Sequence, residues 1–97
     1  MRIAEILSFL TEIGVPYSFQ GNEEAEVYRF SSLTNYKPGS FTWIKTQSNI
    51  PEGMDCTALA LAFVSEDVTG DFGNVIRSSQ SKFAFFSTIE HFYADDE

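Results

Sequence analysis

Apolar residues near the N-terminus recur at steps of three and four positions, which is the period of an amphipathic helix. The apolar positions of this repeat are Ile3, Ile6, Leu7, Leu10 and Ile13. Gly14 and Pro16 follow, and both residue types commonly end a helix. The pattern therefore predicts a helix over about residues 2–13.

The next two segments alternate apolar and polar residues, as half-buried strands do. They cover residues 17–19 and 27–30, and Gly21, Asn22 and the acidic run 23–26 lie between them. This order predicts a strand, a turn and a strand, with the glutamates at the tip of a hairpin. Acidic residues at a turn are typical of a solvated surface, and we prefer that interpretation to a cation site.

The middle of the chain contains a predicted turn between two more strands. Pro38 and Gly39 occupy the inner positions of a type II turn, in which Gly accepts the positive second φ. A predicted strand over residues 41–44 follows, and then a long polar loop over residues 45–55. Residues 58–64 are almost all apolar, which predicts a central strand covered on both faces.

The last third of the chain predicts a brief strand at residues 74–76 and a final helix that Ser79 or Ser81 caps. One face of this helix carries Phe85, Phe86, Ile89, Phe92 and Tyr93. Residues 94–97 are charged and aperiodic, as an acidic tail or the start of a linker would be. The elements together predict one α/β domain of the α+β type over residues 1–93, with a mixed sheet of about four to five strands and a helix at each end.

Composition narrows the classes of partner. The chain has 97 residues, 43% of them hydrophobic, which is enough material for one core. Its formal charge of -8 repels phosphate backbones and anionic membranes. We therefore expect neither a nucleic acid nor a membrane as partner. A single cysteine and an N-terminus without the features of a signal peptide predict a cytoplasmic protein.

The residues that most often carry catalysis or bind metals have simpler interpretations here. Asp71-Phe72-Gly73 spells a kinase magnesium motif without the rest of that fold, and we interpret it as a coincidence. His91 is predicted on a helix surface and Cys56 as a packing residue beside the central strand. The sequence therefore predicts no catalytic centre, no metal site and no cofactor.

The strongest candidate for a binding site lies around Trp43, at the end of a predicted strand. Four polar residues of the following loop are the candidates beside it: Lys45, Thr46, Gln47 and Asn49. An indole ring can stack on a flat base, and an amide side chain matches the donor and acceptors on the edge of uracil. A lone Trp at a strand end is also a common core residue, so the residues alone leave both interpretations open.

Five segments of the chain match a known family in their order and spacing: residues 1–7 (MRIAEIL), 31–33 (SSL), 37–44 (KPGSFTWI), 57–64 (TALALAFV) and 81–86 (SKFAFF). In this order they resemble the N-terminal, non-repeat domain of the UDP-3-O-acylglucosamine N-acyltransferases, enzymes of lipid A biosynthesis. In that family the segment after the Pro-Gly turn is similar to Phe-Leu-x-Asn-x-x-Tyr, in which Phe and Tyr flank uracil and Asn bonds its edge. Trp43 falls at the Phe position, Thr46 at the Asn position and Asn49 at the Tyr position. The start of the last helix is similar to the Pro-Arg-x-Ala-Phe segment of the family.

This resemblance implies a domain without catalytic residues that binds the uridine end of a UDP-sugar in a bacterial acyltransferase. Trp43 would stack on the base, Gln47 or Asn49 would read its edge, and Lys45 would lie near the phosphates. Acyl transfer would belong to a left-handed β-helix domain, in cis or in trans. The alternative is a structural or protein-interaction domain that has lost the nucleotide and docks a partner through aromatics such as Phe83 and Tyr93.

Overall fold

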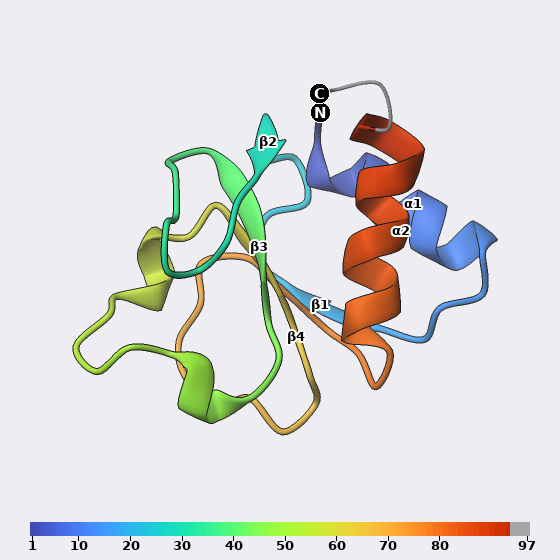
Figure 1. Ribbon diagram of the computed structural model, residues 1–97. Coiled ribbons are helices and arrows are strands. Elements are labelled where there is room, and N and C mark those ends of the chain that lie inside the picture. The colour runs from blue at the N-terminus through green and yellow to red at the C-terminus, as the bar shows by residue number, and fades with distance from the viewer. Residues whose placement is uncertain (94–97) are drawn as a thin grey trace.

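The computed structural model describes residues 1–93, which form two α-helices and a five-stranded mixed sheet (Figure 1). The elements in chain order are α1 (Ile3–Glu12), β1 (Ser18–Gln20), β2 (Arg29–Phe30), β3 (Ser40–Ile44), η1 (Gln47–Asn49), η2 (Cys56–Ala58), β4 (Leu61–Val64), β5 (Val75–Arg77) and α2 (Ser81–Tyr93). The elements η1 and η2 are single turns of 3-10 helix. The predicted fold class is confirmed, and residues 94–97, the predicted tail, lie outside the described residues.

The helix α1 forms where the apolar period predicts it. Its buried residues are Ile3, Ile6, Leu7 and Leu10, all of which belong to the predicted face. The segment before β2 completes its first turn, because the amides of Ile3 and Ala4 donate to the carbonyls of Ala25 and Glu23 at 2.9 and 2.8 Å. The acidic run therefore lies beside the start of α1, where Glu24 also forms an ion pair with Arg2 at 3.0 Å.

The predicted hairpin between residues 17–19 and 27–30 is wrong. The strand order is β1-β5-β4-β3-β2, so the two segments form opposite edges of the sheet. β1 pairs with β5 in the antiparallel sense, and Phe19 faces Ile76 in the register. β2 pairs with β3 in parallel over two residues, Arg29 and Phe30. The acidic run is consequently a connection past the N-terminus of α1 and not the tip of a turn.

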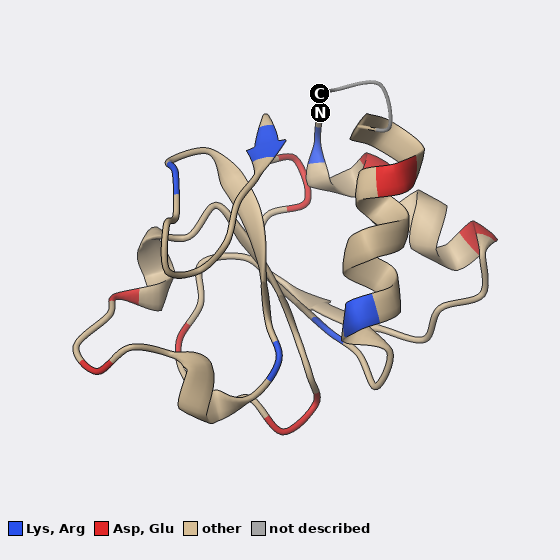
Figure 2. Cartoon of the chain, in the orientation of Figure 1, with Lys and Arg blue, Asp and Glu red and all other residues tan. Residues whose placement is uncertain are grey.

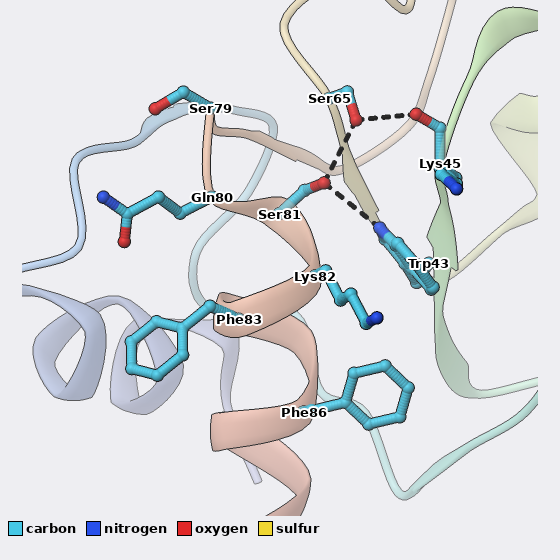
Figure 3. Close-up of a pocket in the computed structure, with 9 residues that line it drawn as sticks. All are labelled: Trp43, Lys45, Ser65, Ser79, Gln80, Ser81, Lys82, Phe83 and Phe86. Carbon is cyan, nitrogen blue, oxygen red and sulfur yellow. Dashed lines mark hydrogen bonds between the residues drawn. The ribbon is translucent and has the colours of Figure 1, made fainter.

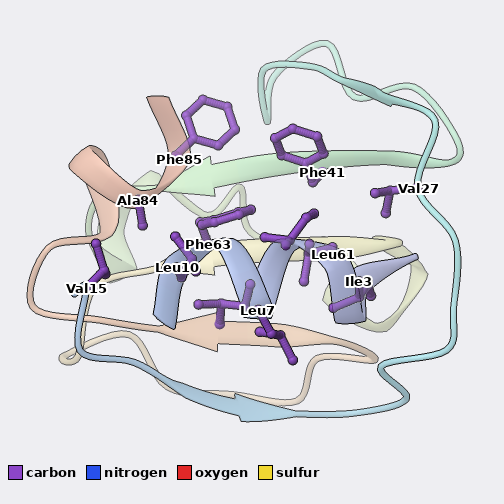
Figure 4. Packing of buried hydrophobic residues seen from close by; sticks show 12 residues of the cluster. Ile3, Leu7, Leu10, Val15, Val27, Phe41, Leu61, Phe63, Ala84 and Phe85 are labelled. Carbon is purple, nitrogen blue, oxygen red and sulfur yellow. The ribbon is translucent and has the colours of Figure 1, made fainter. Parts of the chain in front are cut away.

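The apolar strand β4 lies at the centre of the sheet, as its composition predicts. All four of its residues are buried, and its neighbours β3 and β5 both run parallel to it. On one face Leu61 and Phe63 pack with the residues of both helices (Figure 4). On the other face Ala62 and Val64 pack beneath the loops, against Leu33, Leu59 and Val68 among others.

The turn before β3 and the end of the chain differ in how well the sequence predicts them. The amide of Ser40 donates to the carbonyl of Lys37 at 3.2 Å and Gly39 has a φ of 80°, which confirms the type II turn. In α2, Phe85 is buried but Phe86 is 48% exposed, so the predicted apolar face is wrong at that position.

No helix among residues 1–93 is long and apolar enough to span a membrane.

Candidate functional site

A pocket of about 650 Å³ lies between the end of β3, the end of β4 and the first turn of α2 (Figure 3). Nine residues line it: Trp43, Lys45, Ser65, Ser79, Gln80, Ser81, Lys82, Phe83 and Phe86. β3 and β4 are parallel, so their carboxyl ends meet at this edge of the sheet. The crevice outside the carboxyl ends of parallel strands is the usual ligand site of open α/β sheets.

The turn that brings α2 to this edge is held by Ser78. Its hydroxyl donates to the carbonyl of Pro16 at 2.6 Å and accepts from the amide of Gln80 at 2.9 Å. The carbonyl of Gln80 then accepts the first hydrogen bond of the helix, from Ala84 at 2.9 Å. The amides of residues 81–83 precede that bond, so they have no acceptor within the helix and the positive end of the helix dipole faces the pocket wall.

A chain of hydrogen bonds joins the three elements around the pocket (Figure 3). The Ser65 hydroxyl donates to the carbonyl of Lys45 at 2.6 Å, which uses its only proton. Ser81 must therefore be the donor in its 3.2 Å bond with the Ser65 hydroxyl. The indole Nε1 of Trp43 in turn donates to Ser81 at 3.1 Å. The direction of every bond in the chain is thus settled, and Trp43 is fixed in orientation.

Aromatic rings form one wall of the pocket. The ring of Phe85 stacks near Trp43 with centroids 6.3 Å apart, and the exposed ring of Phe86 meets Trp43 edge-on at 5.8 Å. Trp43 and Phe86 also line a second, smaller hollow of about 290 Å³ on the other side, which is mostly apolar. The two rings are therefore shared by the two hollows.

The charges at the pocket are positive, in contrast to the acidic chain. Lys45 and Lys82 are two of the six basic residues, and neither ammonium has a hydrogen bond or ion pair within residues 1–93. Figure 2 shows basic segments at the ends of β3 and β5 and at the start of α2, and an acidic one in the turn after β4. No aspartate or glutamate is among the described residues that line the pocket. The pocket thus combines an aromatic wall with two unneutralised cations, which suits an anion that carries a flat ring.

The structure brings together two of the five predicted site residues. Trp43 and Lys45 line the pocket, whereas Thr46, Gln47 and Asn49 are not among its lining residues. The side-chain oxygen of Gln47 accepts from the amide of Thr69 at 2.7 Å, across the loops. The side-chain oxygen of Asn49 accepts from the amide of Thr46 at 3.2 Å and closes the turn η1. Both amide groups therefore hold the loop together, and the amide that does line the pocket is that of Gln80.

Seven of the nine lining residues are not among the site residues predicted from the sequence: Ser65, Ser79, Gln80, Ser81, Lys82, Phe83 and Phe86. The sequence predicts Ser79 or Ser81 as a helix cap and Phe86 on one face of the last helix, and Ser81 and Phe86 also belong to the segment 81–86 that carries the resemblance. One signal for Lys82 exists, because it stands at the Arg position of the Pro-Arg-x-Ala-Phe segment in the resembling family. No comparable signal exists for Ser65, which reaches the pocket only because β4 lies beside β3.

The remaining titratable candidates have structural surroundings. Burial, and next the charge of Asp55, raises the pKa of Cys56, which packs against the smaller core cluster. His91 is exposed on α2, as predicted, and its ring stacks on Phe9 of α1 with centroids 4.2 Å apart. Among the described residues no group of three or more His, Cys, Asp or Glu could hold a metal ion.

Comparison with known proteins gives no match to the chain, whether among family models, curated proteins or solved structures. The candidate function therefore depends on the pocket and on the resemblance described above.

Proposed function

We propose that this domain binds the nucleotide end of a UDP-sugar in the pocket between β3, β4 and α2, and that it takes no part in the chemistry. The observation that carries the proposal is the meeting of Trp43, Phe86, Lys45 and Lys82 in one pocket. The two rings offer a surface for stacking a base, worth about 1–3 kcal/mol. The two ammoniums and the open amides of the first turn of α2 offer charge-assisted donors to phosphate.

The identity of the base as uracil rests on the resemblance and on chemistry. Gln80 carries the one side-chain amide among the described residues that line the pocket, and such an amide matches the donor and acceptors on the edge of uracil. Under this proposal the acyl transfer belongs to a left-handed β-helix domain of a bacterial lipid A enzyme, in cis or in trans. The cytoplasm is the compartment in which such a module meets a UDP-sugar.

A titration with UDP and UDP-N-acetylglucosamine tests the proposal. Trp43 is the only tryptophan of the chain, so a change in its fluorescence reports on the pocket directly. We expect saturable changes, and amide NMR shifts concentrated in residues 43–45 and 79–86. No response at millimolar nucleotide, or shifts confined to other parts of the sheet, would contradict it.

Matched lysine variants sharpen that experiment. Lys45→Met and Lys82→Met each remove one hydrogen bond to a charged group, which is worth about 1.5–3 kcal/mol, so each weakens UDP binding by about tenfold or more. Lys37→Met is the control, because Lys37 is exposed at the turn before β3 and does not line the pocket. Equal affinities for all three variants would show that the nucleotide binds elsewhere.

Exposed rings on α2 favour a second candidate function, the docking of a protein. Phe83 is 55% exposed and Phe86 is 48% exposed, and they lie one turn apart on the helix. Tyr93 is partly buried instead, because its ring packs against Phe30 and Phe41 at 5.9 and 5.7 Å. Light scattering at several concentrations, with Phe83→Ser as the comparison, tests self-association through this surface.

A further inference from the structure

The charges around the pocket determine in which form a diphosphate can enter it. Two ammoniums line the pocket and no carboxylate does, among residues 1–93. The acidic residues closest in sequence, Glu66 and Asp67, follow the lining residue Ser65, but both are exposed. Glu66 lines a separate hollow together with Arg77 and Ser79. The charged groups that line the pocket are therefore both cationic, as far as the described residues go.

A diphosphate reaches a protein either as the free anion or as its Mg²⁺ complex. At neutral pH the free diphosphate end of UDP carries about three negative charges, because the second pKa of a terminal phosphate is about 6. Mg²⁺ removes two of them, and proteins that take the complex usually hold the ion through one or two carboxylates as well as the phosphates. A pocket whose two charged groups are ammoniums repels Mg²⁺. Its electrostatic attraction to the phosphates is also weaker when Mg²⁺ has partly neutralised them.

We infer that the pocket recognises the diphosphate as the metal-free anion, and that Mg²⁺ competes with the domain for its ligand. This inference rests on the proposed function. Lys45 and Lys82 then take the place that the metal ion has in many nucleotide sites. The affinity of the domain for UDP consequently falls as free Mg²⁺ rises, because the ion binds the ligand. The diphosphate of a UDP-sugar has no terminal phosphate and carries about two negative charges, so the same effect is smaller for it.

A UDP titration followed by Trp43 fluorescence, first in EDTA and then at increasing free Mg²⁺, tests the inference. If only the metal-free form binds, the apparent Kd rises by the factor 1 + [Mg²⁺]/K, in which K is the Mg²⁺–UDP dissociation constant measured in the same buffer. Free Mg²⁺ at twice K therefore raises the apparent Kd about threefold. NaCl added to the EDTA arm at equal ionic strength separates this competition from screening.

Two further measurements make the outcomes distinct. Amide NMR spectra of the protein with Mg²⁺ alone show whether the ion binds the acidic surface and changes the pocket. UMP, whose single phosphate binds Mg²⁺ less strongly, is the control ligand and is expected to show a smaller effect. An apparent Kd that is unchanged or lower in Mg²⁺ overturns the inference and leaves the proposed function standing. An absence of UDP binding in EDTA and in Mg²⁺ overturns both.

Discussion

Replacing Ser81 by alanine removes the hydroxyl at the centre of the hydrogen-bond chain around the pocket. Ser81 is 5% exposed and makes two partly buried hydrogen bonds, one with the Trp43 indole and one with Ser65. Two hydrogen bonds at about 0.5–1.5 kcal/mol each give a loss of about 1–3 kcal/mol in the free energy of unfolding. The better helix propensity of alanine returns at most about 0.5 kcal/mol. The net loss is then about 0.5–2.5 kcal/mol, and at about 4–8 °C per kcal/mol for a domain of this size it lowers Tm by about 2–20 °C.

The control for this variant is Ser79→Ala. Ser79 lines the same pocket but is exposed, and within residues 1–93 its side chain makes no hydrogen bond. We expect its free energy of unfolding to change by less than about 0.5 kcal/mol. Urea unfolding followed by fluorescence and by circular dichroism measures both variants. The indole N–H resonance of Trp43 in NMR spectra should shift in Ser81→Ala and stay in place in Ser79→Ala.

A double-mutant cycle with Trp43→Phe isolates the bond between the indole and Ser81. Phenylalanine keeps a ring in place but removes the Nε1 donor, so the cycle should give a coupling of about 0.5–1.5 kcal/mol. A coupling of zero, together with equal stabilities of Ser81→Ala and Ser79→Ala, would refute the hydrogen-bond chain and the fixed orientation of the indole that we derive from it.

Two further predictions concern the loops. The hydroxyl of Thr57, and next its amide, donate to Asp55 and lower the pKa of that carboxyl. The stabilising effect of these bonds is present above the unfolded-state pKa of Asp55 and is lost as pH falls through the folded pKa. Thr57→Ala should therefore raise the pKa of Asp55 in an NMR titration, and an unchanged pKa would contradict this cause. Gly39→Ala and Gly14→Ala both place alanine at a φ near +80°, which costs about 1–2 kcal/mol, but a Cβ at Gly39 also lies 3.1 Å from the ring of Tyr28. Urea unfolding should therefore find Gly39→Ala the less stable of the two, and the opposite order would count against the close packing of that turn.

The parts of the fold that the sequence predicts are those in which a local pattern determines the structure. The period from Ile3 to Leu10 specifies one face of α1 wherever that helix packs. The apolar run that contains β4 indicates burial on both faces, and its central place in the sheet follows from that burial. Gly39 predicts the turn before β3, because few residues other than glycine adopt the positive φ that the turn requires. None of these predictions needs knowledge of a distant partner.

The hairpin prediction failed because strand pairing is not a local property. Phe19 pairs with Ile76, and Phe30 pairs with Phe41, yet both strands have the same alternation that a hairpin has. The candidate site failed in part for the same reason. Gln47 and Asn49 are close to Trp43 in sequence, but their amides are used within the loop. Lys82 is far from Trp43 in sequence and reaches the pocket only because the first turn of α2 lies beside the end of β3 in the folded chain.

The position of β1 at the edge of the sheet, with β5 as its partner, has a consequence for how the chain folds during synthesis. The first sixty residues contain α1 and three strands, but they lack β4, the central strand that pairs with β3 and β5, and they lack β5, the only partner of β1 among the described strands. A nascent chain that has not yet released residues 75–77 from the ribosome therefore exposes an unpaired strand edge and the apolar side of α1. Such non-local closure is slow, and unpaired edges promote aggregation. Fragments that stop before β5 should accordingly depend on chaperones, whereas the intact domain should not.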